Sequence, residues 1–561
     1  MKSSYPSHWN VLPPPPAEYI RVAGVPPIIA QFLYNRGVEP HAISAFLTID
    51  DRLQVSPFLL PDMTPAVSRI YTALLTREKI AVYGDLDVDG VTATAVLVES
   101  LTQLGGDVIT YIPDRFSEGH GLKSAGIQTL RSQGARLIIT VDCGVSDLAE
   151  TKQAQSMGID MIVTDHHNPL PTLPSAVAVI DAKRQDSRYP FSELAGVGVA
   201  FKLAQALLYK HGEAQRLTDL LDLVALGTVA DLVSLTGENR RFVKDGLKVL
   251  NTTGRVGLRE MIQLAGLRQG QVDAEDIAWA LGPRLNAAGR IDTATTSYRL
   301  LTTQSVAEAR ALARELEDSN RERKRVASEA LCHAKQRLDG KFHLPLLMEC
   351  DESYPVGVIG LVAGKLTDEF YRPAVIVKLD PELCRGSGRS IPEFNLADAL
   401  AQCHDLLAAF GGHPSAAGFA VAPQNLAQLE ERLTLLAQEQ LSHLDLRPKL
   451  NIDAEISLSA LTGDTLNLMR QLEPFGQGNP CPTLLSPGVE VIEHHSLGDQ
   501  GQWLALKLKQ GDVVWRAVDF ESHKRQDEIT PLIDAVYNIG RNQWNGEEVL
   551  ELRLLDFAPS V

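Results

Sequence analysis

The sequence predicts an α/β protein in which a parallel-sheet catalytic domain, a long connecting helix, a second α/β domain and a C-terminal β-barrel follow one another. Three observations support this prediction. Short apolar runs alternate with amphipathic segments between residues 79 and 181, which is the pattern of a buried parallel sheet. Neither glycine nor proline occurs between Gly289 and Gly340, which favours one long helix there. Residues 450–561 consist of alternating runs separated by turns, as in a small barrel.

The composition is that of a globular protein with several domains. The 561 residues suffice for about three to four domains, and an apolar content of 44% supplies their cores. A net charge of −17 excludes a general polyanion binder, although one basic groove can lie on an acidic body. None of the six cysteines forms a CxxC pair, so neither a zinc ribbon nor a disulfide framework is indicated. The N-terminus has no apolar signal core and no run of about 18 apolar residues occurs, so we expect a cytoplasmic protein without a membrane segment.

Five apolar runs are the expected strands of the parallel sheet, and most are followed by an acid or a histidine. Ligands of such sheets bind at the carboxyl ends of the strands, so these polar residues form the candidate site. The first run precedes Asp85, Asp87 and Asp89, whose side chains point the same way along an extended chain. Taken alone, these aspartates also fit a calcium loop or a solvated acidic turn. The expected strands are Ile80–Tyr83, Val108–Ile112, Leu137–Val141, Met161–Thr164 and Val177–Ile180.

Further candidate ligands follow other apolar segments. Asp142 follows the third run, and Asp165-His166-His167 follow the fourth. Asp231 lies near the end of the apolar segment Leu220–Val233, where it is either a solvent-edge residue or a further ligand. Five carboxylates and one imidazole fit two divalent ions, and the imidazole favours Mn over Mg. Two such ions suit attack of water on a phosphate, so we expect metal-dependent hydrolysis of a phosphoanhydride or a phosphodiester. The candidate ligands are Asp85, Asp87, Asp89, Asp142, His166 and Asp231.

The downstream half contains three segments with several glycines and one long expected helix. Gly282–Arg290 is expected to be a polar loop, and Ser305–Asp339 one helix of about 50 Å. Arg385–Ser390 and Phe410–Gly418 are expected to be glycine-rich turns, which together with Arg389 and His413 favour a phosphate site. In the last region, Trp503, Lys507 and Lys509 share one face of a strand, where the tryptophan either stacks on single-stranded bases or packs the barrel.

The order of these motifs resembles the DHH phosphoesterase superfamily and, within it, the RecJ family of bacterial single-strand-specific exonucleases. The matching stretches lie between Lys79 and Ala420 and read DLDVDG, PDR, GHGL, VDCG, DHH, ADL, GPRLNAAGR, GSGRS and FGGHPSAAG. Two stretches depart from the family pattern. His120 stands where RecJ proteins commonly have tyrosine, and Tyr354-Pro355-Val356 precede a GVIG motif where Trp-His is often found. These departures leave the candidate metal ligands intact but put substrate contacts at His120 and Tyr354 in doubt.

The resemblance implies 5′→3′ hydrolysis of single-stranded DNA to mononucleotides with two Mn or Mg ions, in DNA recombination and repair. It implies the same six metal ligands and a catalytic group of Asp142, Asp165 and His167, with His167 near the scissile phosphate. It places Arg115, Ser387 and Arg389 at the 5′-terminal phosphate or the backbone. It places Asn286, Arg290 and His413 along the nucleic-acid channel. Arg284 either joins this channel or forms an interdomain salt bridge.

The resemblance also implies the domain organisation and the partners. The expected partners are single-stranded DNA with a 5′ end, a single-stranded-DNA-binding protein and a helicase, and we expect the chain to be a monomer. One alternative is a DHH phosphodiesterase or pyrophosphatase acting on small phosphoesters, which the long helix and the barrel disfavour. Another is an inactive replisome scaffold, which the full ligand set disfavours. The expected parts are an N-terminal extension (1–55), a DHH catalytic domain (56–300), a connecting helix (301–340), a DHH-associated nucleic-acid-binding domain (341–435) and an OB-like domain (450–561).

Overall fold

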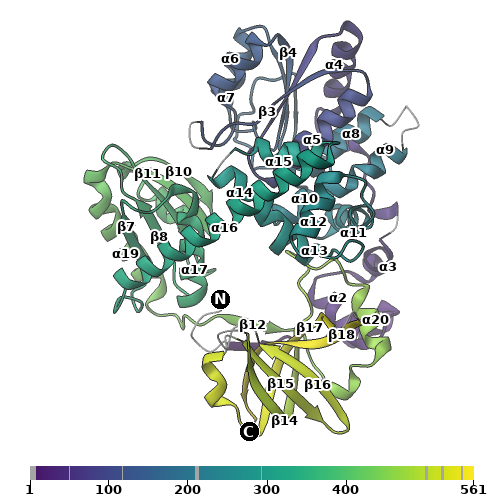
Figure 1. Ribbon diagram of the computed structural model, residues 1–561, viewed down its shortest axis with the longest axis vertical. Coiled ribbons are helices and arrows are strands. Elements are labelled where there is room, and N and C mark those ends of the chain that lie inside the picture. Colours follow the sequence, from purple (N-terminus) through teal and green to yellow (C-terminus); the bar gives the residue numbers. More distant parts are fainter. Residues whose placement is uncertain are drawn as a thin grey trace. The chain divides into compact units, whose positions relative to one another are not determined.

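The computed structural model comprises two compact units (Figure 1). It describes residues 8–49, 51–115, 118–208, 214–291, 293–498, 503–519, 523–544 and 547–560. The first unit contains His41–Arg321 and Gln471–Pro480, and the second contains Met1–Pro40, Glu322–Arg470 and Cys481–Val561. None of the helices formed by the described residues is long and apolar enough to span a membrane.

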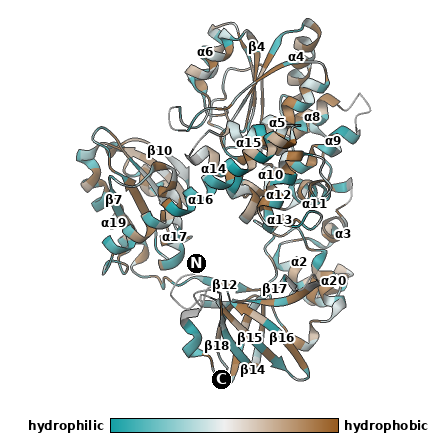
Figure 2. Ribbon diagram, in the orientation of Figure 1, coloured by the Kyte–Doolittle hydropathy of each residue, from teal (hydrophilic) through white to brown (hydrophobic). Residues whose placement is uncertain are grey.

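The first unit is built on a sheet of five parallel strands in the order β3-β2-β4-β5-β6. All five strands that the sequence predicts are present, and none of their ends differs from the prediction by more than two residues. Alternate residues of β2 face two separate apolar cores, Ile80 and Val82 one core, Ala81 and Tyr83 the other. The central strands are therefore apolar on both faces, and the ribbon of this sheet includes hydrophobic stretches in Figure 2. Their bounds are β2 (Lys79–Gly84), β3 (Asp107–Tyr111), β4 (Ala135–Val141), β5 (Asp160–Thr164) and β6 (Ala178–Ile180).

Helices complete both of these cores. On one face pack α4 (Met63–Thr76), α5 (Val88–Gln103), α8 (Gly196–Leu208) and α10 (Leu221–Ala230). On the other face pack α6 (Ser124–Ser132) and α7 (Leu148–Ser156). The other α-helices that lie wholly in this unit are α3 (Ile43–Thr48), α9 (Ala214–Asp219), α11 (Gly237–Asn251), α12 (Val256–Leu264), α13 (Ala274–Asp276), α14 (Gly282–Ile291) and α15 (Thr295–Thr302).

The prediction of a polar loop at Gly282–Arg290 is wrong, because this segment forms α14. A π-helical turn, Ile277–Leu281, leads directly into it. The Gly282 N–H bonds to the Ile277 carbonyl five residues back, so the helix continues through Pro283, which has no backbone N–H to pair. The glycines at both ends suggested a loop, but the helix accommodates them.

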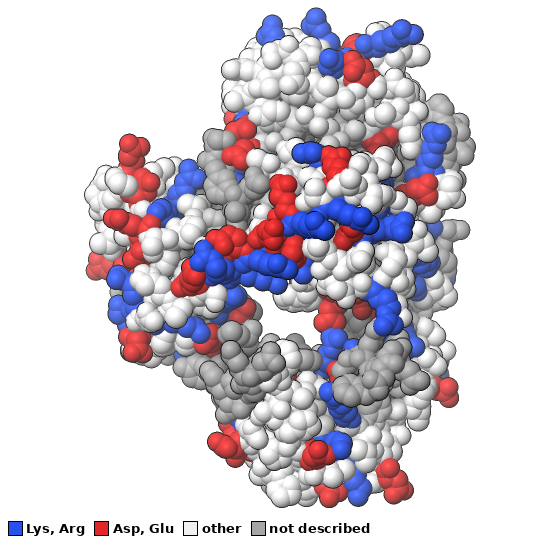
Figure 3. Space-filling model, viewed as in Figure 1, with Lys and Arg blue, Asp and Glu red and all other residues white. Residues whose placement is uncertain are grey.

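The long helix that the sequence predicts is present as α16 (Val306–Arg337). Both signs of charge crowd along it in the space-filling view (Figure 3). Arg325 pairs with Glu322 and with Glu329, each at 2.6 Å, at the i,i+3 and i,i+4 spacings that support an exposed helix. Its first half belongs to the first unit and its second half to the second.

The second unit contains a five-stranded mixed sheet in the order β10-β11-β9-β8-β7. The first of the two glycine-rich turns expected in this region is a strand instead, since Arg385–Arg389 lie in β9. The second, Phe410–Gly418, is a hairpin whose turn is limited to Pro414 and Ser415, between β10 and β11. Packing explains the glycines: a Cβ at Gly386 would lie 2.1 Å from the Phe419 ring, and one at Gly388 would lie 2.6 Å from Leu396. The elements are β7 (Leu347–Asp351), α17 (Val356–Phe370), β8 (Ala374–Lys378), β9 (Cys384–Arg389), α18 (Leu396–Ala401), β10 (Leu407–His413), β11 (Ala416–Val421) and α19 (Leu426–Leu441).

The C-terminal region forms a closed, OB-like β-barrel, which confirms the predicted fold class. Its sheet has the order β13-β14-β15-β16-β18-β17, and pairing of β14 with β17 closes it. The leucines of β15 are buried, whereas Lys507 is exposed and paired with Glu493. Trp503 is 39% exposed, and the side chain of Trp544 lies outside the described residues. The elements are β12 (Lys449–Ile452), β13 (Ala454–Glu455), α20 (Gly463–Arg470), β14 (Leu484–Leu497), β15 (Trp503–Gln510), β16 (Val513–Asp519), β17 (Leu532–Trp544) and β18 (Glu547–Pro559).

The N-terminal segment packs within the second unit. Strand β1 (His8–Val11) pairs in parallel with β12, and Trp9 donates a hydrogen bond to Asp556 of the barrel at 2.9 Å. Helices α1 (Ala17–Ala23) and α2 (Pro27–Asn35) follow. From His41 onward the chain belongs to the first unit. The domain boundaries expected from the sequence stay predictions.

Candidate metal centre

Asp85, Asp87 and Asp89 converge through a strand-to-helix turn. Strand β2 ends at Gly84, Asp87 caps α5 by accepting a hydrogen bond from the Gly90 N–H at 3.1 Å, and Asp89 lies in the first helical turn. The expected alternation along an extended chain is therefore wrong. The turn is tight, since a Cβ at Gly90 would lie 2.6 Å from the backbone of Asp85. The partial positive charge of a helix N-terminus favours carboxylates at this position.

Asp89 is buried against the N-terminus of a second helix. Its carboxylate accepts hydrogen bonds from the backbone N–H groups of Gly196 (2.6 Å) and Val197 (2.8 Å) at the start of α8. Burial, together with the neighbouring charge of Asp87, raises the pKa of Asp89 to about 7. Two helix N-termini therefore hold this carboxylate, a feature that strand patterns do not predict.

His166 lies at the centre of the cluster. Its Nε2 is 3.0 Å from Asp142 Oδ1, 3.7 Å from Asp231 Oδ2 and 3.8 Å from Asp89 Oδ2. Asp142 follows β4 in the left-handed backbone region, with φ 60°, and its N–H donates to the Thr164 carbonyl at 3.0 Å. A non-glycine residue at positive φ is uncommon and often marks a functional position.

The buried polar atoms at this centre fit divalent cations. Among the described residues, Asp142 Oδ1, His166 Nε2 and Asp231 Oδ2 are buried without a hydrogen-bond partner. Such atoms are costly unless something binds them. Three sets of residues each offer three ligand atoms that lie within 4.8 Å of one another; His166 belongs to two of the sets, and Asp142 belongs to two. An oxygen-rich set with one imidazole suits Mn or Mg. The sets are Asp142, His166 and His167; Asp89, His166 and Asp231; and Asp85, Asp87 and Asp142.

The electrostatics agree with this fit. Burial and the surrounding aspartates raise the pKa of Asp142 well above its usual range, and burial with the charges of Asp89 and Asp87 raises that of Asp231 to about 9. Burial, and then the neighbouring charge of His167, lowers the pKa of His166 to about 3. His166 is therefore neutral, as a metal ligand must be. A cation would relieve the crowding of the carboxylates.

Asp165 does not point its charge at the cluster but binds the two histidines that follow it. Its Oδ1 accepts the His166 N–H at 2.8 Å and lies 2.8 Å from His167 Nδ1, while its Oδ2 accepts the Val145 N–H at 2.9 Å. Burial opposes protonation of His167, but the hydrogen bond and charge of Asp165 raise its pKa to about 9. His167 is half exposed, so it presents a protonated ring at the edge of the centre.

His120 lies at this centre, although sequence reasoning treated it only as a departure from a family pattern. Its Nδ1 is 3.3 Å from Asp85 Oδ2, and its Nε2 is 3.0 Å from a terminal nitrogen of Arg115. Arg115 also donates from Nε to the Gly289 carbonyl of α14. No spacing rule identifies His120, because it lies in a loop that follows no strand directly.

The α14 residues anchor the aspartate turn. Asn286 Oδ1 accepts the Val88 N–H at 3.1 Å, between two of the candidate ligands. Arg284 pairs with Glu317 of α16 at 2.6 Å within the first unit. The side chain of Arg290 lies outside the described residues.

Ser387, Arg389 and His413 belong to the second unit. Arg389 and Ser387 lie on β9, with a terminal nitrogen of Arg389 3.4 Å from Ser387 Oγ, and burial lowers the pKa of Arg389. A Cβ at Gly360 of α17 would lie 3.0 Å from Ser387 Oγ and 3.2 Å from Arg389, so this helix packs closely over the pair. His413 is exposed on β10, opposite Ala416, which in turn lies opposite Arg389. The three side chains therefore come from one stretch of the sheet.

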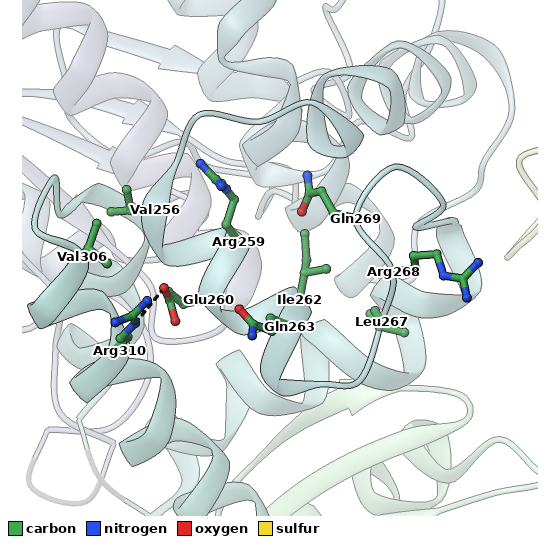
Figure 4. A pocket seen from close by; sticks show the side chains of 10 residues that line it. All are labelled: Val256, Arg259, Glu260, Ile262, Gln263, Leu267, Arg268, Gln269, Val306 and Arg310. Carbon is green, nitrogen blue, oxygen red and sulfur yellow. Dashed lines mark hydrogen bonds and ion pairs between the residues drawn. The ribbon is translucent and has the colours of Figure 1, made fainter. Parts of the chain in front are cut away.

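A separate cavity of about 470 Å³ lies in the first unit, beside α12 and the start of α16 (Figure 4). None of the candidate metal ligands lines it. Glu260 on its wall is paired with Arg310 at 3.1 Å. The cavity is therefore distinct from the carboxylate cluster.

Comparison with known proteins extends over nearly the whole chain. The DHH family N-terminal domain matches residues 79–228, the DHHA1 domain residues 343–439 and the RecJ OB domain residues 452–556. The single-stranded-DNA-specific exonuclease RecJ of Bacillus subtilis is 37% identical over 542 residues, which cover 96% of this chain and 68% of that protein. Its counterpart in Salmonella typhimurium is 33% identical and covers 96% of both chains. This chain belongs to the RecJ family.

A solved RecJ structure has the same fold. RecJ from Thermus thermophilus in complex with Mn²⁺ superimposes with a TM-score of 0.84 at 30% identity, covering 99% of this chain and 80% of that one. The RecJ resemblance expected from the sequence is confirmed, and the barrel is a RecJ OB domain. The roles assigned to individual site residues stay predictions.

Proposed function

We propose that this protein is a metal-dependent 5′→3′ exonuclease that hydrolyses single-stranded DNA to mononucleotides, in DNA recombination and repair. The observation that carries this proposal is the cluster around His166, where Asp142 Oδ1 and Asp231 Oδ2 are buried without hydrogen-bond partners among the described residues. Membership of the RecJ family supports the choice of substrate.

The six candidate ligands would hold two Mn or Mg ions. When bound, two such ions supply an activated water and neutralise charge that develops on the phosphate. Asp89 is oriented by the N–H groups of Gly196 and Val197, and Asp142 by the backbone that its N–H ties to Thr164. The scaffold thus presents these carboxylates in fixed positions, which lowers the cost of organising them during the reaction.

His167 would act on the phosphate. Its Nδ1 is held by Asp165, so Nε2 is the nitrogen left to donate a hydrogen bond to a phosphate oxygen. Arg115 and His120 extend the positive edge beside Asp85. On the second unit, Arg389 and Ser387 would bind the 5′-terminal phosphate, because a guanidinium and a hydroxyl together recognise phosphate oxygens. Asn286, Arg290 and His413 would line the nucleic-acid path.

Several further properties belong to this proposal. We infer that the chain acts as a cytoplasmic monomer, and that a single-stranded-DNA-binding protein and a helicase supply its substrate. The OB barrel suits single strands, because such barrels combine aromatic and basic side chains. The catalytic domain would extend over residues 56–300, and the nucleic-acid-binding domain over residues 341–435.

The test is release of mononucleotides from a 5′-phosphorylated single strand with Mn²⁺. We expect Asp142→Ala and His166→Ala to abolish release, and Asp186→Asn, an exposed partner of Arg184, to leave it intact. Preference for a dinucleotide over the long strand would instead support a small-substrate phosphodiesterase. Unchanged release by either alanine variant contradicts the proposed metal centre.

A further inference from the structure

A ten-residue segment of the C-terminal half, Gln471–Pro480, folds with the first unit. We call this segment the strap. It connects α20 to β14 of the OB barrel. The segments on both sides of it belong to the second unit, but its own contacts place it in the first. A short segment that packs on a different unit from the residues on either side of it needs favourable contacts with that unit.

Arg240 of α11 supplies most of these interactions. It is completely buried, and its terminal nitrogens donate to the carbonyls of four successive strap residues. Its Nε donates to the Phe46 carbonyl at 3.2 Å, and its guanidinium lies 4.0 Å above the Phe46 ring. Arginine has five N–H donors in a fixed planar arrangement, so it can donate to several backbone carbonyls at once. Lysine has three donors on a single nitrogen and cannot reach the same set of carbonyls. The strap carbonyls and distances are Gln471 (3.0 Å), Leu472 (2.8 Å), Glu473 (2.8 Å) and Pro474 (3.5 Å).

The second half of the strap packs on the loop between α10 and α11. The Leu235 N–H donates to the Gln477 carbonyl at 2.7 Å. Gly478, at φ 72°, approaches Ser234 so closely that a Cβ would lie 2.1 Å from its Oγ. A Cβ at Gly476 would likewise lie 2.6 Å from the Leu235 side chain. The strap therefore covers this loop in direct contact, with no room for larger residues.

The covered loop starts at the candidate ligand Asp231. Asp231 lies at the end of α10, three residues before Ser234, and its Oδ2 is 3.7 Å from His166 Nε2. Leu232, the next residue, has φ 62°. This backbone conformation is unfavourable for a non-glycine residue, so the neighbouring structure must hold it. The Leu232 side chain is 67% exposed, and the contacts with the strap begin two residues later, at Ser234 and Leu235.

We propose that the strap is a positioning element of the metal centre: it holds the loop of residues 231–236 so that Asp231 faces His166. This inference rests on the proposed metal-dependent function. It gives a segment that precedes the OB barrel in the sequence a role in metal binding, because this segment also supports the loop that carries a metal ligand. Residues that orient a metal ligand typically change metal affinity by about 10–100-fold when they are mutated.

The test compares two glycine substitutions in the full-length protein. Gly478→Val places a side chain against Ser234, whereas Gly488→Val introduces similar backbone strain at φ 63° with its nearest neighbour, Ser560 Oγ, 3.9 Å away. We expect Gly478→Val to weaken Mn²⁺ binding, measured by calorimetry, by about 10-fold or more. We expect Gly488→Val to bind Mn²⁺ with the same affinity as the unaltered protein. In the metal-free protein, the amides of Leu232–Leu235 should exchange hydrogen faster in Gly478→Val alone.

Equal Mn²⁺ affinity in the two valine variants, with only the unfolding midpoint lowered, would overturn the inference and leave the strap a structural link. If Gly478→Val does not fold, Gly478→Ala and Arg240→Lys carry the same test, since each disturbs the strap with a smaller change in volume. Both should weaken Mn²⁺ binding in the same direction, and unchanged affinity in both overturns the inference. Absence of Mn²⁺ binding by the unaltered protein would instead contradict the proposed function, so the two failures are distinguishable.

Discussion

Oδ1 of Asp165 lies 2.8 Å from Nδ1 of His167 and also accepts the backbone N–H groups of His166 and His167. One buried carboxylate oxygen thus fixes the ring of one histidine and the backbone of both. The two histidines therefore have different positions: His166 faces the carboxylate cluster, and His167 faces the open edge of that cluster.

This relationship predicts the effect of Asp165→Asn. The substitution keeps the shape of the side chain but removes the charge that orients His167. We expect kcat on single-stranded DNA to fall by about 10²-fold or more, as loss of an oriented acid–base group does. Mn²⁺ affinity should change far less, because Asp165 is not a ligand. His167→Gln should lower kcat to the same extent, and a large loss of Mn²⁺ affinity in both variants would contradict the assigned roles.

The crowded carboxylates predict a trade between stability and function. At pH 7 Asp231 is ionised in the unfolded chain, whereas in the folded metal-free protein burial and the charges of Asp89 and Asp87 raise its pKa to about 9 and keep it protonated. Folding must therefore take up a proton, and Asp231→Asn removes that cost. We expect the metal-free Tm to rise by about 2–4 °C, the shift that ~1 kcal/mol gives in a domain of about 150–250 residues. The increase in Tm that Mn²⁺ gives the unaltered protein should disappear. Calorimetric unfolding with and without chelator measures both effects, and a lower metal-free Tm contradicts the prediction.

The pair Lys202–Glu238, which includes no candidate metal ligand, predicts a large effect on stability. The two side chains are fully buried, with Nζ 2.7 Å from the carboxylate, which also accepts hydrogen bonds from Tyr189 and from the Val55 N–H. Lys202→Met leaves Glu238 as a buried charge without its cation, so we expect a loss of about 3–5 kcal/mol. Lys248→Met, which breaks an exposed pair with Asp245, is the control and should change little. Urea unfolding measures the free energy of unfolding of both variants. An equal loss in the two variants would contradict the expected cost of an unpaired buried charge.

The glycines of β9 predict a packing effect in the second unit. Gly386→Ala places a Cβ 2.1 Å from the Phe419 ring, and such overpacking costs about 1–3 kcal/mol. Gly411→Ala, on nearby β10, meets no atom within 4 Å and should be tolerated. Thermal unfolding of the two variants measures the difference. Equal unfolding midpoints would mean that the ring moves aside at no cost.

The phosphate site proposed at Arg389 predicts a change in substrate preference. If Arg389 binds the 5′-terminal phosphate, Arg389→Ala should raise KM for 5′-phosphorylated strands but change KM little for strands with a 5′ hydroxyl. Loss of one charge-assisted contact of about 1.5–3 kcal/mol corresponds to roughly a 10–100-fold effect. Arg385→Ala, on the same strand and exposed, is the matched control. An equal rise in KM for both kinds of strand would contradict this role.

The parallel sheet was predictable because its strands are apolar on both faces, and the long helix because Val306–Arg337 contains neither glycine nor proline. The segments that sequence reasoning misassigned are rich in glycine. Glycine marks a turn as often as a close contact, and only the neighbouring Phe419 shows that Gly386 serves a contact. The convergence of Asp87 and Asp89 was expected, but its cause, the start of α5, follows from capping rather than from strand alternation.

His120 and the strap were beyond reach for a different reason. Their roles depend on residues far away in sequence, such as Asp85 for His120 and Arg240 for Gln471, and no local pattern encodes such pairs.

The measurement that tests the central claim most directly is titration of Mn²⁺ into the purified full-length protein and into His166→Ala, followed by assay of the same samples on a 5′-phosphorylated single strand. The proposed metal centre predicts two bound Mn²⁺ ions and release of 5′-terminal mononucleotides by the unaltered protein, with loss of metal binding and of release in His166→Ala. Release of mononucleotides by His166→Ala at the unaltered rate, or by the unaltered protein after complete removal of metal, would contradict it.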